Sequence, residues 1–124
     1  MFLNKVLLES LPKSVPDYIN LNYQDGDLIA LCTWAEKTME LKFNHVESFR
    51  VSIEGLLLKM QASLKFTGDC FVYGGDKLDL YTWINDQTYG YLDTINFHKT
   101  MLISSDEIIE IIYGGEMQII RECS

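Results

Sequence analysis

The stretch YINLNYQDGDLIALCTW, residues 18–34, predicts a β-hairpin and with it an antiparallel fold. Apolar and polar residues alternate over residues 18–23, and this period of two is typical of a strand. Asp25-Gly26 follows, and Asp-Gly is a preferred hairpin turn because glycine readily adopts positive φ. The return segment, Leu28–Trp34, is almost continuously apolar, which predicts a strand buried on both faces.

Two more strands are predicted around an interruption in MELKFNHVESFRVSI, residues 39–53. Apolar residues occupy odd positions at both ends of this segment, but Asn44–Ser48 break the alternation. One bulged strand or two strands joined by a tight turn would explain the break, and we favour the turn. Arg50 is expected on the polar face, where a surface ion pair across the sheet would be worth only about 0–1 kcal/mol.

Helical spacing of apolar residues over Leu3–Leu11 predicts a short N-terminal helix that ends at Pro12. A second helix is predicted within residues 76–90, capped by Asp76 and closed by Gly90. Residues 56–66 alternate like a strand, which we favour, although their composition also suits a helix.

The remaining strands are predicted from short apolar runs. They cover residues 70–75 and 94–105, and residues 106–120 predict a C-terminal hairpin around Gly114-Gly115. The sequence therefore predicts one α+β domain over residues 1–124: a mainly antiparallel β-sheet of about six or seven strands with two short helices. Trp34 follows an apolar strand, so we expect it to be more buried than Trp83.

The charge of the chain is unevenly distributed. Residues 1–65 carry eight acids and seven bases, a balance of −1, whereas residues 66–124 carry ten acids and three bases, a balance of −7. Nucleic acids and anionic membranes are bound through Lys and Arg, so this balance argues against both partners. It permits a basic protein partner. Plain solubility would explain the same excess of acids.

The sequence contains no motif that specifies catalysis or metal binding. It lacks nucleophile-elbow, phosphate-loop and metalloprotease patterns, and His45 and His98 stand 53 positions apart without nearby carboxylates at ligand spacing. We therefore expect a non-enzymatic protein without cofactor or metal. No cleavable leader or apolar run of about 20 residues is seen, so a cytoplasmic location is expected.

The segment from Asp69 to Asp93 combines five aspartates and six aromatic residues with a single Lys77. Tyrosine and tryptophan recur as interface anchors, and carboxylates around them steer a basic partner. A helix that packs its aromatic residues into the core and leaves its acids in water would give the same pattern. The candidate partner-binding residues are Asp79, Trp83, Asp86, Tyr89, Tyr91 and Asp93.

Three segments carry a resemblance to a known class of proteins. LKFNHVESFRVSIEG, DLYTWINDQTYG and INFHKTMLISSDEIIEIIYGG lie within residues 40–115 and resemble small acidic β-rich bacterial proteins. Among these are immunity proteins of polymorphic toxin systems, including contact-dependent growth inhibition. The resemblance implies an inhibitor that binds one cognate toxin, often a nuclease with a basic cleft. It carries over no individual residue.

Two other functions remain open. An aromatic-lined pocket would make the protein a small ligand-binding or enzymatic domain, and such a site should be a concavity of roughly 300–1,000 Å³ with convergent polar groups. An exposed sheet edge would permit a homo-oligomer.

The cysteines provide a first test. Cys32, Cys70 and Cys123 are odd in number and lack a CxxC spacing, so we expect no disulfide in a reducing compartment. Thiol titration of the unfolded protein without reductant should find three free groups. Finding a single free group would contradict the prediction.

Overall fold

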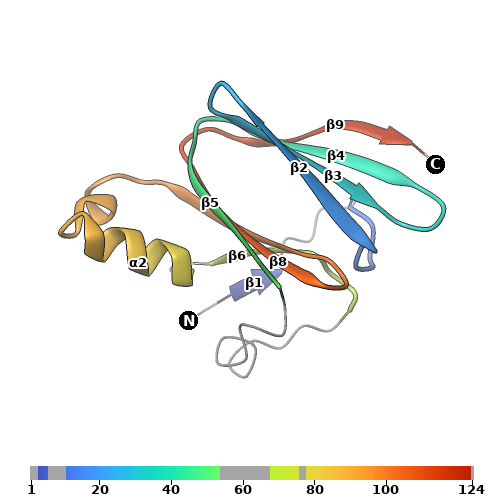
Figure 1. Cartoon of the computed structure of the whole chain (residues 1–124), viewed down its shortest axis with the longest axis horizontal. Coiled ribbons are helices and arrows are strands. Elements are labelled where there is room, and N and C mark those ends of the chain that lie inside the picture. The colour runs from blue at the N-terminus through green and yellow to red at the C-terminus, as the bar shows by residue number, and fades with distance from the viewer. Residues whose placement is uncertain (1–2, 6–10, 54–67, 76–77, 124) are drawn as a thin grey trace.

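The computed structural model describes residues 3–5, 11–53, 68–75 and 78–123. Within them the chain forms two antiparallel sheets (Figure 1). Sheet A has the strand order β1-β6-β7-β8-β5, and sheet B has the order β2-β3-β4-β9. The elements are β1 (Leu3–Lys5), β2 (Tyr18–Gln24), β3 (Asp27–Thr33), β4 (Thr38–Phe43), β5 (Val46–Ile53), β6 (Val72–Gly75), α2 (Asp79–Gln87), the 3-10 helix η2 (Tyr91–Thr94), β7 (His98–Ile103), β8 (Glu107–Tyr113) and β9 (Met117–Cys123).

The predicted mainly antiparallel β fold is confirmed, but as two sheets rather than one. The predicted hairpin is β2–β3, in register from Tyr18–Thr33 to Gln24–Asp27. Asp25 and Gly26 form its turn with φ of 52° and 85°. The expectation that the return strand is buried on both faces is wrong. In β3, fully buried side chains alternate with half-buried ones, because only one face of sheet B packs on the core.

A shared bend connects the two sheets. Strand β4 pairs with β9 in sheet B, and β5 pairs with β8 in sheet A, so two bent strands run side by side through both sheets. Figure 1 shows β5 leaving the upper sheet and running down into the lower one. The pairing continues across the bend, where the N–H groups of Gly114 and Gly115 donate to the carbonyls of His45 and Asn44.

This geometry corrects two sequence predictions. The two predicted strands are confirmed as β4 and β5, but the favoured turn over Asn44–Ser48 is wrong. The connection is a bend at Asn44-His45, with His45 at φ 55°, and an irregularity in pairing follows between Val46 and Ser48. Residues 106–120 form the two predicted strands, but β8 and β9 lie in different sheets and make no hairpin. Both errors arise because the alternation of side chains identifies a strand but not its partner.

The predicted N-terminal helix is also wrong where the structure describes it. Leu3–Lys5 is a strand that pairs with β6, from Leu3–Gly75 to Lys5–Tyr73. The rest of that helix and the ambiguous segment 56–66 lie outside the described residues. Sheet pairing has overridden a helical pattern that was only a local preference.

The core fills the space between the sheets. The rings of Phe43 and Tyr113 meet edge to face at 5.1 Å, and those of Trp34 and Phe71 at 5.2 Å. Trp34 is 9% exposed and Trp83 is 60% exposed, which confirms the expected order of burial. Every residue of β8 from Ile108 to Tyr113 is buried, so both faces of this interior strand of sheet A are covered.

The bend generates a stability prediction. A Cβ on Gly115 would lie 2.7 Å from Asn44 Cβ and 2.8 Å from its carbonyl oxygen, so the paired backbones would have to separate. Gly115→Ala should lower the free energy of unfolding by about 1–3 kcal/mol, as overpacking does. A Cβ on Gly114 would meet only ordinary contacts, at 3.8 Å or more. Gly114→Ala is therefore the matched control and should stay within about 1 kcal/mol of wild type. Equal losses in denaturant titrations of the two variants would contradict the role of the bend.

Candidate functional site

The helix that carries most of the candidate residues begins against a buried carboxylate. Leu78, the residue before α2, supplies no side-chain cap, and the predicted cap Asp76 lies outside the described residues. The backbone N–H of Leu80 instead donates to Glu110 Oε2 on β8, at 2.8 Å. An acceptor from the neighbouring sheet thus satisfies one of the free N–H groups at the helix start.

Glu110 also pairs with Arg50 of β5. Its side chain is 0% exposed, and Glu110 Oε1 accepts from Arg50 Nε at 2.9 Å and from Arg50 Nη2. Arg50 Nη2 reaches Asp79 Oδ2 at 2.9 Å as well. Burial alone would lower the pKa of Arg50, but the hydrogen bonds and charges of Asp79 and Glu110 outweigh it and raise that pKa. Arg50 was expected to form an ion pair at the surface, but it instead connects β5 to the buried Glu110 and to the start of α2.

A second network ties η2 to α2. Tyr81 donates from its hydroxyl to Asp93 Oδ1 at 2.6 Å, and Asn85 Nδ2 donates to Asp93 Oδ2 at 2.9 Å. Asn85 also accepts from the backbone N–H of Asp93 at 3.2 Å. Desolvation, with the hydrogen bond to Asp93, raises the pKa of Tyr81 to about 12. Lys99 Nζ lies 4.6 Å from the centre of the Tyr81 ring and covers it.

Three candidate aromatic side chains are exposed to solvent: Trp83 on α2, Tyr91 at the start of η2, and Tyr89 in the turn between them. Trp83 is 60% exposed, Tyr89 is 100% exposed and Tyr91 is 56% exposed. We call these three residues the aromatic surface. Tyr81, from the same stretch of sequence, is buried and connects α2 to η2 through its hydrogen bond to Asp93. The stretch therefore divides into a buried structural part and an exposed part.

The three candidate acids differ in what they contact. Asp79 bonds to Arg50, and Asp93 accepts from Tyr81 and Asn85, so both contribute to the scaffold as well as to the surface charge. Asp86 is exposed, and its carboxylate makes no hydrogen bond or ion pair within the part of the chain that is described. Asp86 can therefore act on a partner without loss of an internal contact.

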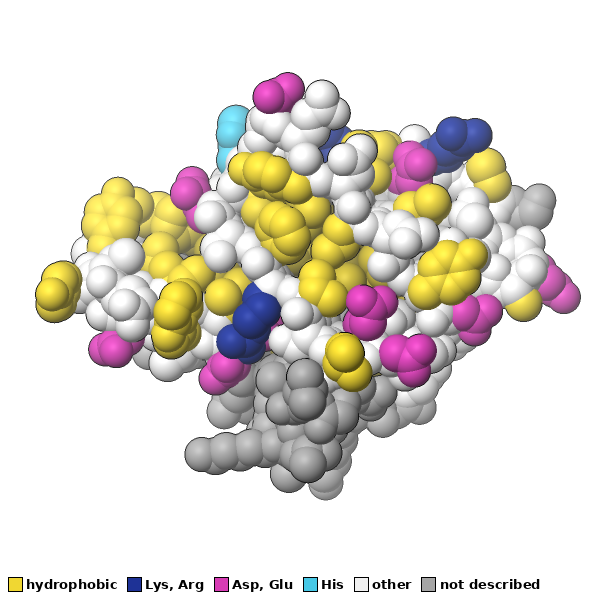
Figure 2. Space-filling model, in the orientation of Figure 1, with side chains coloured by type: hydrophobic (Ala, Val, Ile, Leu, Met, Phe, Trp, Pro, Cys, Tyr) yellow, Lys and Arg dark blue, Asp and Glu magenta, His cyan; other side chains and the backbone are white. Residues whose placement is uncertain are grey.

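A hollow of about 390 Å³ lies between β5 and α2 and opens to solvent. It is lined by Ser48, Phe49, Arg50, Leu80 and Trp83. Figure 2 shows the exterior of this region, where hydrophobic side chains lie on both sides of a basic side chain and acidic side chains lie close by. Phe49 and Arg50 could not be assigned to the site from the sequence, because only the fold brings β5 next to α2.

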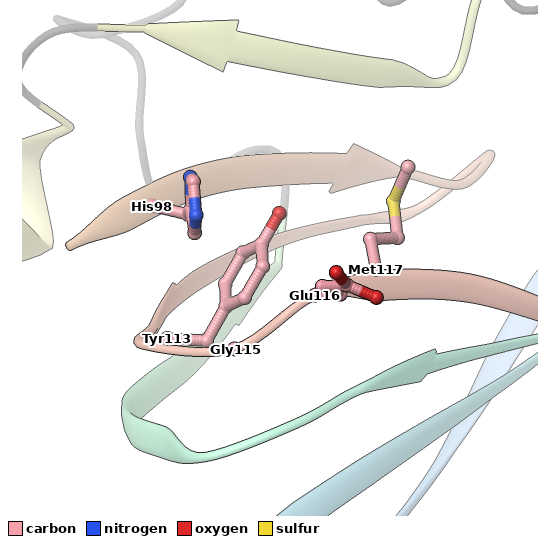
Figure 3. Close-up of a pocket in the computed structure, with 5 residues that line it drawn as sticks. All are labelled: His98, Tyr113, Gly115, Glu116 and Met117. Carbon is pink, nitrogen blue, oxygen red and sulfur yellow. The ribbon is translucent and has the colours of Figure 1, made fainter.

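A smaller hollow of about 280 Å³ lies at the bend and is lined by His98, Tyr113, Gly115, Glu116 and Met117 (Figure 3). The hydroxyl of Tyr113 is 2.7 Å from that of Thr100, and burial raises the pKa of Tyr113. His98 packs on the Tyr113 ring at 5.4 Å between centres. Tyr113 is therefore a neutral, hydrogen-bonded core residue rather than an activated nucleophile.

The described residues contain no cluster of three or more His, Cys, Asp or Glu side chains arranged to hold a metal. No helix among them has both the length and the apolar composition needed to cross a membrane. Cys32 and Cys70 are buried and Cys123 is exposed. Burial raises the pKa of Cys32 to about 12, which keeps its thiol protonated and unreactive.

The link at Glu110 generates a second stability prediction. Glu110→Gln removes the negative charge that pairs with Arg50 and should lower the free energy of unfolding by about 2–3 kcal/mol. This loss is smaller than the loss expected for a fully buried ion pair, because Arg50 stays partly hydrated. Glu107→Gln makes the same charge change on the same strand and should shift the free energy of unfolding by no more than about 0.5 kcal/mol. Denaturant titration checks both. Similar losses for the two variants would show that the link contributes little.

Comparison of the chain with family models, curated proteins and solved structures finds no match. Inference about function therefore depends on the geometry of the site.

Proposed function

We propose that this protein is a non-enzymatic binding protein that docks a basic protein partner on the aromatic surface of α2 and η2. The observation that carries the proposal is the exposure of Trp83, Tyr89 and Tyr91 on a segment whose two ends are anchored by hydrogen bonds. The sequence resemblance favours an immunity protein that neutralises a toxin in the cytoplasm, with a toxin nuclease domain as the partner.

Exposed aromatic side chains on an anchored scaffold suit binding for a physical reason. Tyrosine and tryptophan provide large contact areas with a polar tip, and they dominate the binding energy of many interfaces. The hydrogen bonds of Asp93 and Glu110 hold α2 and η2 in place before binding. This reduces the conformational entropy that is lost on association. Solubility alone explains the acidic side chains but not the exposure of three aromatic side chains, Trp83, Tyr89 and Tyr91, within one short segment.

The charge of the segment favours a basic partner. Residues 78–98 contain three aspartates and no Lys or Arg. Carboxylates next to an aromatic patch speed the encounter with a positive surface, and added salt screens this attraction. A nuclease cleft, which must attract phosphates, has the complementary charge.

A ligand-binding domain is the alternative, and the hollow between β5 and α2 is the observation that favours it. Its volume of about 390 Å³ falls within the range of small-molecule sites. However, Arg50, its charged lining residue, is already bonded to Glu110 and Asp79. A partner surface uses the exposed aromatic residues and the hollow together, so we place the binding protein first.

Capture of partners from a lysate of the source organism, followed by affinity measurements on variants, tests the proposal. Trp83→Ala and Tyr91→Ala should each weaken binding by about 2 kcal/mol or more, mainly through faster dissociation. Asp86→Asn should slow association and flatten its dependence on salt. Tyr18→Ala removes a half-exposed tyrosine of β2 in sheet B and is the control that should leave binding unchanged. If the Trp83 and Tyr91 variants bind every captured protein as tightly as wild type, the proposal is wrong.

A further inference from the structure

We infer that the hollow between β5 and α2 accepts an arginine side chain of the partner. This inference rests on the proposed function and specifies the chemistry of one subsite within it. The hollow is lined by Phe49, Leu80 and Trp83, with Ser48 and Arg50 as its polar members. The apolar residues suit the aliphatic stem of an arginine, and the face of Trp83 suits its planar guanidinium.

The charges around the hollow favour a cation over an anion. Arg50 carries one positive charge, but Glu110 and Asp79 both bond to it, so the three groups together carry a net charge of −1. Glu110 is 0% exposed, and its two oxygens already accept hydrogen bonds from Arg50 and from the Leu80 N–H. The surplus negative charge therefore resides on Asp79, whose side chain is 58% exposed.

Asp79 retains an oxygen for the incoming group. Its Oδ2 bonds to Arg50, whereas its Oδ1 makes no hydrogen bond within the described part of the chain. A guanidinium that stacks on Trp83 would find this acceptor about one helical turn away, on the first residue of α2. An anionic group would instead meet two carboxylates already bonded to Arg50, and repulsion would exclude it.

Trp83 lines the hollow and is also one of the three exposed residues of the aromatic surface. An arginine seated in the hollow would leave the rest of the partner free to contact Tyr89 and Tyr91. We therefore expect a basic loop that inserts one arginine, rather than a positive surface that only approaches the acids.

The indole N–H signals of the protein provide a direct test, because the chain has two tryptophans in contrasting places. Trp83 lines the hollow, whereas Trp34 is buried and donates from Nε1 to the Ser14 carbonyl at 3.3 Å. The probes are the capped peptide Gly-Arg-Gly, its neutral citrulline isostere and the capped peptide Gly-Glu-Gly, titrated at low salt. The arginine peptide should shift the Trp83 signal saturably and leave Trp34 in place, and the other two peptides should leave both signals unchanged.

Two variants with the same charge change sharpen the test. Asp79→Asn should weaken arginine-peptide binding about fivefold, the upper effect of an exposed ion pair. Glu122→Gln makes the same charge change at an exposed residue of β9 in sheet B, outside both the hollow and α2, and should weaken binding by less than about twofold. The Trp34 signal, unchanged in both variants, reports that the fold is intact.

The outcomes separate this inference from the proposed function. No saturable shift of Trp83 with the arginine peptide, an equal shift with citrulline, or a shift with the glutamate peptide would each overturn the arginine subsite. The partner could still require Trp83 and Tyr91, in which case the binding function would stand without this subsite. Conversely, a specific arginine shift together with partner binding that is indifferent to the aromatic surface would support the subsite and contradict the proposed function.

Discussion

The carboxylate of Glu110 is fully buried on β8, an interior strand of sheet A, and a buried charge is tolerated only when it is paired and hydrogen-bonded. Arg50 supplies the charge from β5, and the Leu80 N–H supplies a further donor from α2. One side chain on β8 thus fixes an edge strand and the start of a helix. The hollow depends on this arrangement, because its lining residues all come from those two elements.

The bend at Asn44-His45 makes this arrangement possible. It carries β4 into β5 while the partner strand bends at Gly114-Gly115, so backbone pairing continues from one sheet to the other. The N–H of Val46 also donates to the Gly26 carbonyl at 2.7 Å, which joins the β2–β3 turn to the bend. Arg50 then stands opposite Glu110 in register, where the link can form.

The elements with a local cause could be predicted from the sequence. Asp25-Gly26 specifies its hairpin through positive φ, and the alternation of apolar residues locates most strands. The helix that carries Trp83 was predicted within residues 76–90 from its start and stop residues. Pairing between distant strands could not be predicted, because alternation carries no information about the partner strand. The candidate site follows the same division: the aromatic surface was identified from local composition, whereas Phe49 and Arg50 join it only through the fold. A buried Glu110 between isoleucines contradicts the usual preference of glutamate for the surface.

The central claim is that anchoring at both ends makes α2 and η2 a rigid platform for Trp83, Tyr89 and Tyr91. Backbone ¹⁵N relaxation over residues 80–93 measures this rigidity in the free protein. The account predicts order parameters of about 0.85 throughout the segment, equal to those of the sheets. Values below about 0.6 from Trp83 to Tyr91 would show a mobile segment and would contradict a preformed binding surface.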